Sequence, residues 1–169
     1  MKNHMVLVFL ILSSFVKGQE TPKVTVEEKL YGVQLGIVSS SFQYEIKLDR
    51  KITLITEVGL QLGSSTKEDN DPLINDETTT IISPYLTIEP RFYYSLDRCT
   101  KLGKKTYNNS ANYFSLAASY FSNRTPLVHS GNIDIVSALS IIPRYGFRRA
   151  FAKHFNYEFS GGMGYQYHF

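Results

Sequence analysis

The sequence has no tryptophan, one cysteine and nearly equal numbers of basic and acidic residues. Because Cys99 has no second thiol to pair with, no disulfide inside the chain holds the fold together. It lies in a polar stretch, where we expect an incidental loop thiol. The 18 Lys and Arg residues against 15 Asp and Glu residues leave a formal net charge of +3. That balance gives no reason to expect a nucleic-acid partner.

Long apolar runs are also scarce, and the single example lies at the N-terminus, over 5–16. A basic start precedes this run and small residues follow it. This pattern is typical of a secretory signal peptide, since a spanning helix needs roughly 20 apolar residues. Any later membrane crossing must therefore use strands. The predicted parts are a signal peptide over 1–18, an N-terminal extension over 19–29 and a β-barrel domain over 30–169.

No stretch after residue 19 shows a helical period of apolar residues. Apolar and polar residues alternate instead, which is the pattern of strands with one apolar and one polar face. The alternation predicts an all-β fold, an antiparallel up-and-down barrel. The alternating segments are 51–63, 81–96, 132–148 and 155–169, with a weaker case at 113–121.

The number of strands depends on the region 31–48, where the apolar phase changes across 38–41. A tight turn there gives seven segments and a β-bulge gives six. Closed single-chain bacterial barrels use an even number, commonly from eight, so we predict eight strands with six as the alternative. The eighth strand comes either from KVTVE (23–27) or from a break in one of the longer segments.

The polar face of these strands decides which side meets water. A solvated exterior is normally rich in Lys, Asp and Glu, whereas this face is mainly Gly, Ser, Thr and Gln with a few charges of both signs. Small side chains and opposite charges suit a filled, narrow interior, which leaves the apolar face outside. The predicted interior charge network, of structural ion pairs, comprises Glu45, Glu57, Glu89, Arg91, Arg144, Arg148 and Glu158.

Two strands share a short pattern, LTIEPRFY (86–93) and LSIIPRYG (139–146). Each places a Pro on the apolar face and an Arg beside it on the polar face, so Arg91 and Arg144 are expected at similar depth. A weak internal repeat and a coincidence of strand composition both explain the match.

The C-terminal segment GMGYQYHF (162–169) combines glycines with aromatic residues at alternate positions. Gly164, Tyr167 and the final Phe169 resemble the signal by which outer-membrane β-barrels are recognised by their assembly machinery. More widely, the chain resembles the small outer-membrane β-barrel domain proteins of Bacteroidota. The segments that carry this resemblance are 44–60, 82–96, 108–113 and 140–149.

The resemblance implies a transmembrane β-barrel in the cell outer membrane. The implied partners are outer-membrane lipid and lipopolysaccharide, with the barrel assembly machinery during insertion. The family has no shared catalytic motif, so the function expected is structural or surface-binding.

Two loop regions carry charge of one sign, an acidic one at 64–80 and a basic one at 97–110. Divalent cations and anionic groups such as lipopolysaccharide phosphates are the corresponding ligands. The acidic run lacks the regular spacing of a calcium loop, and plain solvated loops are favoured for both. We predict no metal and no cofactor.

A catalytic constellation is also missing from the sequence. His129 falls in a loop, while His154 and Ser160 share a polar face but lie six residues apart, about 20 Å along a strand. This separation is too large for a nucleophile and base on one strand. We therefore predict that the protein is not an enzyme and has no catalytic residues.

Alternation also fits a different protein, a secreted soluble β-barrel that binds an apolar ligand in its interior. The two hypotheses differ in which face meets water. In the membrane barrel Leu60→Arg should block assembly, whereas Glu57→Leu should be the milder change. The residues that would line the apolar cavity of the soluble barrel are Leu54, Leu60, Ile88 and Leu139.

Overall fold

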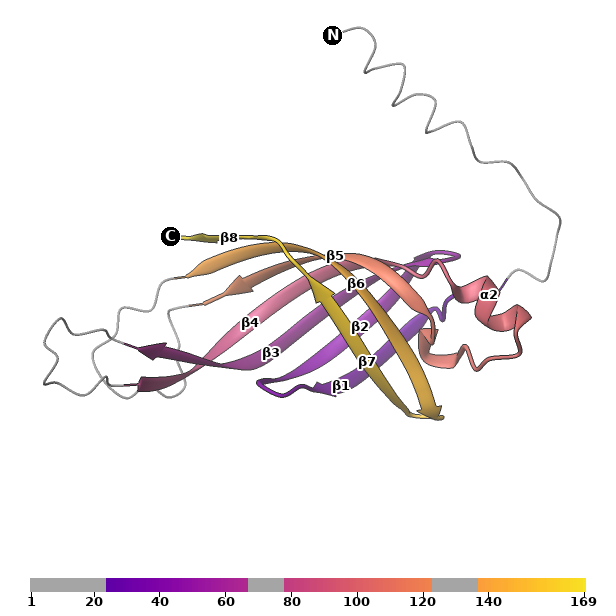
Figure 1. Cartoon of the computed structure of the whole chain (residues 1–169), viewed down its shortest axis with the longest axis horizontal. Helices are drawn as coiled ribbons and strands as arrows, with labels where there is room; N and C mark the ends of the chain where they lie inside the picture. The colour runs from indigo at the N-terminus through magenta and orange to yellow at the C-terminus, as the bar shows by residue number, and fades with distance from the viewer. Residues whose placement is uncertain (1–23, 67–77, 123–136) are drawn as a thin grey trace, which may run out of the picture.

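A computed structural model describes residues 24–66, 78–122 and 137–169. It is dominated by one antiparallel sheet in which consecutive strands are neighbours from β1 to β7 and β8 pairs with β6 (Figure 1). This confirms the predicted all-β, up-and-down antiparallel order. The strands are β1 (Lys29–Leu35), β2 (Ser39–Asp49), β3 (Ile52–Thr66), β4 (Thr78–Phe92), β5 (Asn112–Phe121), β6 (Ala138–Ala152), β7 (Phe155–Gly162) and β8 (Tyr165–His168).

The phase change near residue 38 is a tight turn and not a bulge. Strand β1 ends at Leu35, the amide of Gly36 donates to the carbonyl of Ser39 at 2.8 Å, and β2 runs back along β1. The alternative count of six strands is therefore wrong, because the turn divides this region into two strands.

The segment 24–28 does not supply an extra strand to the sheet. It contains no strand residue, the amide of Val26 donates to the Arg50 carbonyl at 2.9 Å, and the Val26 side chain is buried. The prediction of an eighth strand from 23–27 is therefore wrong for the part of it that the structure describes.

The eighth strand comes from a break in the C-terminal segment. Strand β7 pairs with Arg144–Ala152 of β6, and β8 pairs with Ala138–Ile141 of the same strand. Pro143, which has no amide hydrogen to donate to the ladder, lies opposite the break. The eight strands therefore occupy seven positions across the sheet.

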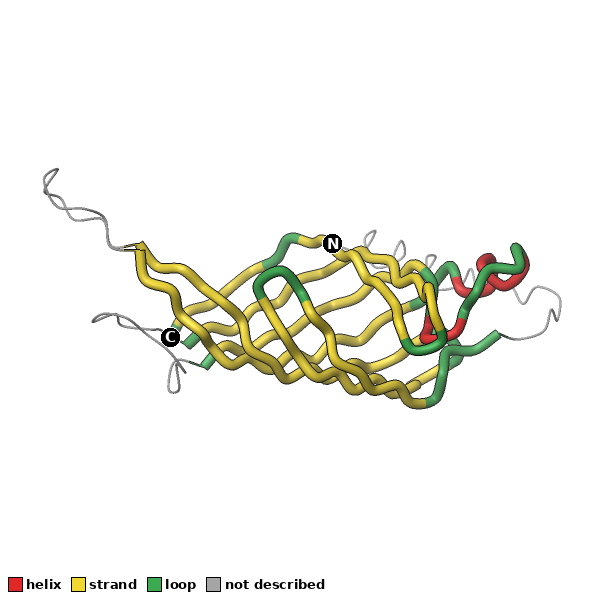
Figure 2. The backbone as a smooth tube through the Cα atoms, turned by 90° about the horizontal axis from the view of Figure 1, so that it is seen from below, coloured by secondary structure: helices red, strands yellow, loops and turns green. Residues whose placement is uncertain are grey.

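The sheet is strongly twisted and curled into a half-barrel (Figure 2). Its two edges are β1 and β7, which are not paired with each other in the described residues. Six antiparallel steps separate them, so these two edge strands run in the same direction.

The two faces of the sheet have opposite character. Residues on the concave side are mainly polar and buried, as Glu45, Thr53 and Glu89 are. The convex side carries large apolar side chains that remain open to the surroundings, and Ile88 is 47% and Leu139 41% exposed. The predicted orientation, with charges inside and apolar side chains outside, is the one observed.

A small cap closes one end of the curled sheet. It contains helix α2 (Leu96–Lys101), a 3-10 turn η1 (Tyr107–Asn109) and the described residues before β1, 24–28. No helix was expected from the sequence, because six residues are too few to show a helical period. The buried apolar cluster here comprises Val26, Tyr93, Leu96, Cys99, Ala111 and Tyr113.

Two features of the cap follow from its sequence. Asn108 and Asn109 have positive φ angles of 53° and 56°, a conformation that asparagine tolerates better than most residues. Cys99 is buried in the cluster, so the expectation of a loop thiol in a polar stretch is corrected. No helix in the described ranges has the length and apolar character needed to cross a membrane.

Candidate functional site

The interior of the sheet holds the charged residues that the sequence singled out. They come from five different strands and point to the concave side because each occupies the inward phase of its strand. Glu45, Glu89, Arg91 and Arg148 are almost fully buried. Burying an unpaired charge costs free energy, so the character of the site depends on which groups pair with these side chains.

Glu158 lies at the centre of this arrangement and accepts from two arginines. Arg91 NH1 and Arg148 Nε both donate to Glu158 Oε2 at 2.8 Å. Arg148 NH1 also donates to Glu45 Oε2 at 2.6 Å. Strands β2, β4, β6 and β7 are therefore linked through ion pairs across the interior.

The network continues to Glu89, which pairs with both arginines of the repeated Pro-Arg pattern. Arg91 Nε lies 2.7 Å from Glu89 Oε1, and Arg144 NH1 lies 3.4 Å from Glu89 Oε2. The two arginines thus reach one carboxylate, as their expected similar depth implies. Six of the seven predicted residues form one continuous network, which we call the interior network: Glu45, Glu89, Arg91, Arg144, Arg148 and Glu158.

Glu57 is the predicted member that stays outside the interior network. It accepts hydrogen bonds from Ser41 Oγ at 2.6 Å and from the hydroxyl of Tyr85, and Gln43 lies at 3.4 Å. Within the described ranges it forms no ion pair. Its inclusion in the charge network is therefore wrong, because neutral donors on β2 and β4 reach it first.

Sequence reasoning missed the tyrosines that complete the interior network. The hydroxyl of Tyr93 donates to Glu45 at 3.0 Å, and the hydroxyl of Tyr113 donates to Glu158 at 2.7 Å. The guanidinium of Arg91 lies 4.3 Å from the Tyr113 ring centroid. The sequence could have revealed Tyr93, because it lies two residues after Arg91 and alternation places both side chains on the same face.

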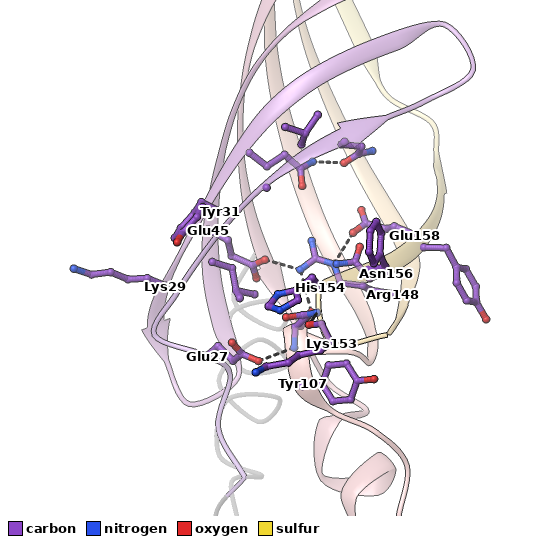
Figure 3. A pocket seen from close by; sticks show the side chains of 18 of the residues that line it. Glu27, Lys29, Tyr31, Glu45, Tyr107, Arg148, Lys153, His154, Asn156 and Glu158 are labelled. Carbon is purple, nitrogen blue, oxygen red and sulfur yellow. Dashed lines mark hydrogen bonds and ion pairs between the residues drawn. The ribbon is translucent and has the colours of Figure 1, made fainter. Parts of the chain in front are cut away.

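The interior network opens into a cavity at the gap between the two sheet edges. The cavity has a volume of about 760 Å³ and lies between β1 and β7 (Figure 3). Glu45, Arg148 and Glu158 form its inner wall, while Lys29 and His154 lie at its rim. Apolar side chains, among them Leu30, Val33 and Phe155, share the cavity wall with these charged groups.

The three residues proposed as an assembly signal lie in and beside the last strand: Gly164 immediately precedes β8, Tyr167 lies within it and Phe169 follows it. A Cβ atom on Gly164 would lie 2.1 Å from the Ile141 carbonyl oxygen, so only glycine fits this close approach. Tyr167 and Phe169 are exposed on the convex side, with ring centroids 5.9 Å apart. Phe169 also approaches the ring of Tyr120, at 6.2 Å, so these aromatic side chains form one outer patch.

The other candidate residues do not assemble into a reactive group. His154 lies in the turn between β6 and β7, and Ser160 lies near the opposite end of β7. His129 is outside the described residues, as is most of the acidic stretch 64–80. In the part of the chain that the structure describes, no three His, Cys, Asp or Glu side chains are placed to hold a metal ion.

The chemistry of this site is that of mutual neutralisation. Each carboxylate of the interior network has an arginine within hydrogen-bonding distance, and Tyr93, Asn109 and Tyr113 donate further hydrogen bonds to Glu45 and Glu158. Comparison with models of protein families, with curated proteins and with solved structures gave no match. The function must therefore be argued from this geometry.

Proposed function

We propose that this chain is an integral β-barrel protein of the bacterial outer membrane, of structural or surface-binding type. It resembles the small outer-membrane β-barrel domain proteins of Bacteroidota, and its partners are outer-membrane lipid, lipopolysaccharide and, during insertion, the barrel assembly machinery. The observation that carries the proposal is the reversed character of the two faces, with ion pairs inside and large apolar side chains outside.

The exposed apolar surface is too extensive for a monomer in water. It includes side chains from every strand of the sheet, among them Val33, Phe42, Leu86, Phe114, Tyr145 and Phe159. Soluble monomers seldom expose contiguous apolar patches beyond a few hundred Å². The outward band is the feature that outer-membrane barrels present to lipid.

A membrane location places one requirement on the gap between β1 and β7. Lipid offers no hydrogen bonds to the backbone groups of a sheet edge, so both edges need partners in the bilayer. Because β1 and β7 run in the same direction, they pair either as parallel strands or through one more strand antiparallel to both. The charges next to these edges already have partners, because Arg148 forms ion pairs with both Glu45 and Glu158.

Cell fractionation tests the proposal directly. The protein should stay with the outer membrane after alkaline extraction, and its gel mobility should shift on boiling, as a folded barrel does. A protein found in the soluble fraction, with no mobility shift, would refute the membrane location and favour the secreted soluble barrel. Leu60, Ile88 and Leu139 would then need to turn inward from the exposed positions they occupy here.

Matched substitutions on the two faces test the orientation. Leu60→Arg places a charge on the outward face and should cost about 2–4 kcal/mol if that position lies at mid-bilayer, which blocks assembly. Leu60→Phe is the apolar control, and Glu57→Leu on the inward face should be the milder change. A normal folded yield of Leu60→Arg in the membrane would overturn the orientation.

A further inference from the structure

A hydrogen-bonded polar cluster lies on the outer wall of the sheet, near the cap. The hydroxyls of Tyr94 and Tyr145 lie 3.1 Å apart, and the side-chain amide of Asn112 donates to both at 3.2 Å. Arg149 NH2 donates to the side-chain oxygen of Asn112. We call Tyr94, Asn112, Tyr145 and Arg149 the outer-wall cluster.

Aromatic rings surround this cluster at the end of the apolar band. Phe114 lies opposite Tyr145 in the strand register, and its ring centroid is 5.3 Å from that of Tyr145 and 5.2 Å from that of Tyr94. All three rings are exposed on the convex side. In outer-membrane barrels, rings in such a position lie at the level of the lipid headgroups.

The cationic group of the outer-wall cluster has no carboxylate to neutralise it. In the described ranges neither Arg149 nor Arg98 of α2 forms an ion pair. Arg149 is held at the cluster by its hydrogen bond to Asn112. The neighbouring carboxylate of Asp97 is already taken by Arg50 and Lys51.

Within the described ranges, the hydrogen bonds of the cluster leave some of its donors without an acceptor. Arg149 NH1 donates to the carbonyl of Arg148 at 2.7 Å and the guanidinium lies 5.4 Å from the Phe147 ring centroid, which fixes its position. A guanidinium has five hydrogens, and the contacts to Asn112 and Arg148 use two of them. One hydroxyl hydrogen joins the two tyrosines, so the other hydroxyl hydrogen is also available.

We propose that the outer-wall cluster binds the phosphate of an anionic phospholipid in the leaflet at the cap end. Arg149 is the main ligand, because a guanidinium matches two phosphate oxygens at once, and the free tyrosine hydroxyl donates to a third. This inference rests on the proposed membrane location, since only there does a lipid headgroup meet these rings.

Lipid binding to the full-length protein in detergent provides the test, with native mass spectrometry as the readout. Phosphatidylglycerol should remain bound to the wild type, whereas phosphatidylcholine, which carries no net charge, should bind more weakly. Arg149→Gln should reduce phosphatidylglycerol binding about tenfold, the effect of losing a charged hydrogen-bond partner. Tyr145→Phe, which removes a hydroxyl only, should reduce it by a smaller factor.

Lys105→Gln is the matched control, because Lys105 is an exposed cation of the cap and its loss changes the net charge equally. Equal weakening by Arg149→Gln and Lys105→Gln would overturn the site in favour of diffuse attraction. Inorganic phosphate that displaces the lipid completely at millimolar concentration would identify a soluble anion as the ligand and also overturn it. If Arg149→Gln does not fold, Tyr145→Phe decides, and unchanged binding by it counts against the site.

The two proposals fail in different ways. A wild-type protein that shows the heat shift and fractionates with the outer membrane, but does not prefer phosphatidylglycerol, refutes the lipid site alone. A protein that is absent from the membrane fraction refutes both.

Discussion

Glu45 and Arg148 are 103 residues apart in the sequence, yet their side chains form a 2.6 Å ion pair inside the curled sheet. Glu45 comes from β2 and Arg148 from β6, so the pair joins the two sides of the interior next to the open edges. In the described residues no strand pairing joins β1 to β7 across that gap. This ion pair therefore links the two sides of the curled sheet across its interior.

Removing Arg148 should be strongly destabilising. Arg148→Met leaves Glu45 without its cation and Glu158 with one arginine in place of two, and breaking a buried ion pair in this way costs about 3–5 kcal/mol. Urea unfolding of the protein in detergent measures the loss. Arg144→Met is the matched control, because Arg144 is partly exposed and 3.4 Å from Glu89, and it should cost less than about 1 kcal/mol.

A double variant separates the pair from its surroundings. Glu45→Gln combined with Arg148→Met should cost less than the sum of the two single changes, because the first removes the charge that the second leaves unpaired. Additive losses would show that Glu45 and Arg148 act independently, which contradicts the geometry.

The open edges predict the outcome of a crosslinking experiment. Val33 on β1 and Tyr157 on β7 line the cavity from opposite sides. In a Cys99→Ala background, Val33→Cys with Tyr157→Cys should form a disulfide slowly or not at all, because no strand pairing holds β1 and β7 side by side in the described residues and a disulfide needs its two Cα atoms within about 7 Å. Val33→Cys with Phe42→Cys should form one readily, since these positions are directly opposite in the β1 and β2 register.

Rapid disulfide formation in the bilayer by the variant with Val33→Cys and Tyr157→Cys would show that β1 and β7 meet directly, as a parallel pair. Repeating the reaction in detergent and in vesicles tells whether the membrane closes the sheet. A closed sheet in both would contradict the described cavity.

The carboxylate that joins the cap to the β2–β3 turn predicts a dependence of stability on pH. Partial burial raises the pKa of Asp97, but the hydrogen bonds and charges of Lys51 and Arg50 outweigh this and hold its pKa below the ordinary value. A lowered pKa in the folded state means that the stabilisation is complete above about pH 4 and is lost as the pH falls through the folded-state pKa.

Asp97→Asn should therefore weaken the protein at neutral pH and flatten the pH dependence below about pH 4. The side chain is about one-third exposed, so the expected loss is within about 1 kcal/mol. Thermal unfolding of both proteins across this pH range measures the difference. Parallel curves for the two proteins would show that Asp97 makes no linked contribution.

Strand positions and face polarity were readable from the sequence because each depends on a period of two. The alternation around Leu60, Ile88 and Leu139 predicted which side chains face outward, and the same phase placed six charges in one network. The sequence could not show that Glu57 stays outside the interior network. Its partner depends on whether Ser41 or an arginine lies nearer, and the register and tilt of the strands decide this.

The cap and the break between β7 and β8 could not be predicted from local sequence patterns, because both depend on contacts between residues far apart in the sequence. Helix α2 has six residues, and its stability comes from the burial of Leu96 and Cys99 against Val26, a residue far away in sequence. The division between β7 and β8 depends on which residues of β6 lie opposite, so Gly164 alone did not reveal it.

The glycines at this break allow a sharp comparison of neighbouring positions. A Cβ atom at Gly164 would lie 2.1 Å from the Ile141 carbonyl oxygen, whereas one at Gly161 would meet nothing within 4 Å. Gly164→Ala should therefore force β8 away from β6 and cost about 1–3 kcal/mol, the usual penalty of overpacking. Gly161→Ala should be close to neutral in urea unfolding, or slightly stabilising, because alanine restricts the unfolded chain.

Assembly in cells separates the two roles of Gly164. If the residue acts through backbone fit, Gly164→Ala should lower both the unfolding free energy in detergent and the folded fraction in the membrane. If it acts only within the assembly signal, the purified variant should be as stable as the wild type while its insertion declines. Equal stability of Gly164→Ala and Gly161→Ala would contradict the close approach to Ile141, because that contact exists at Gly164 and has no counterpart at Gly161.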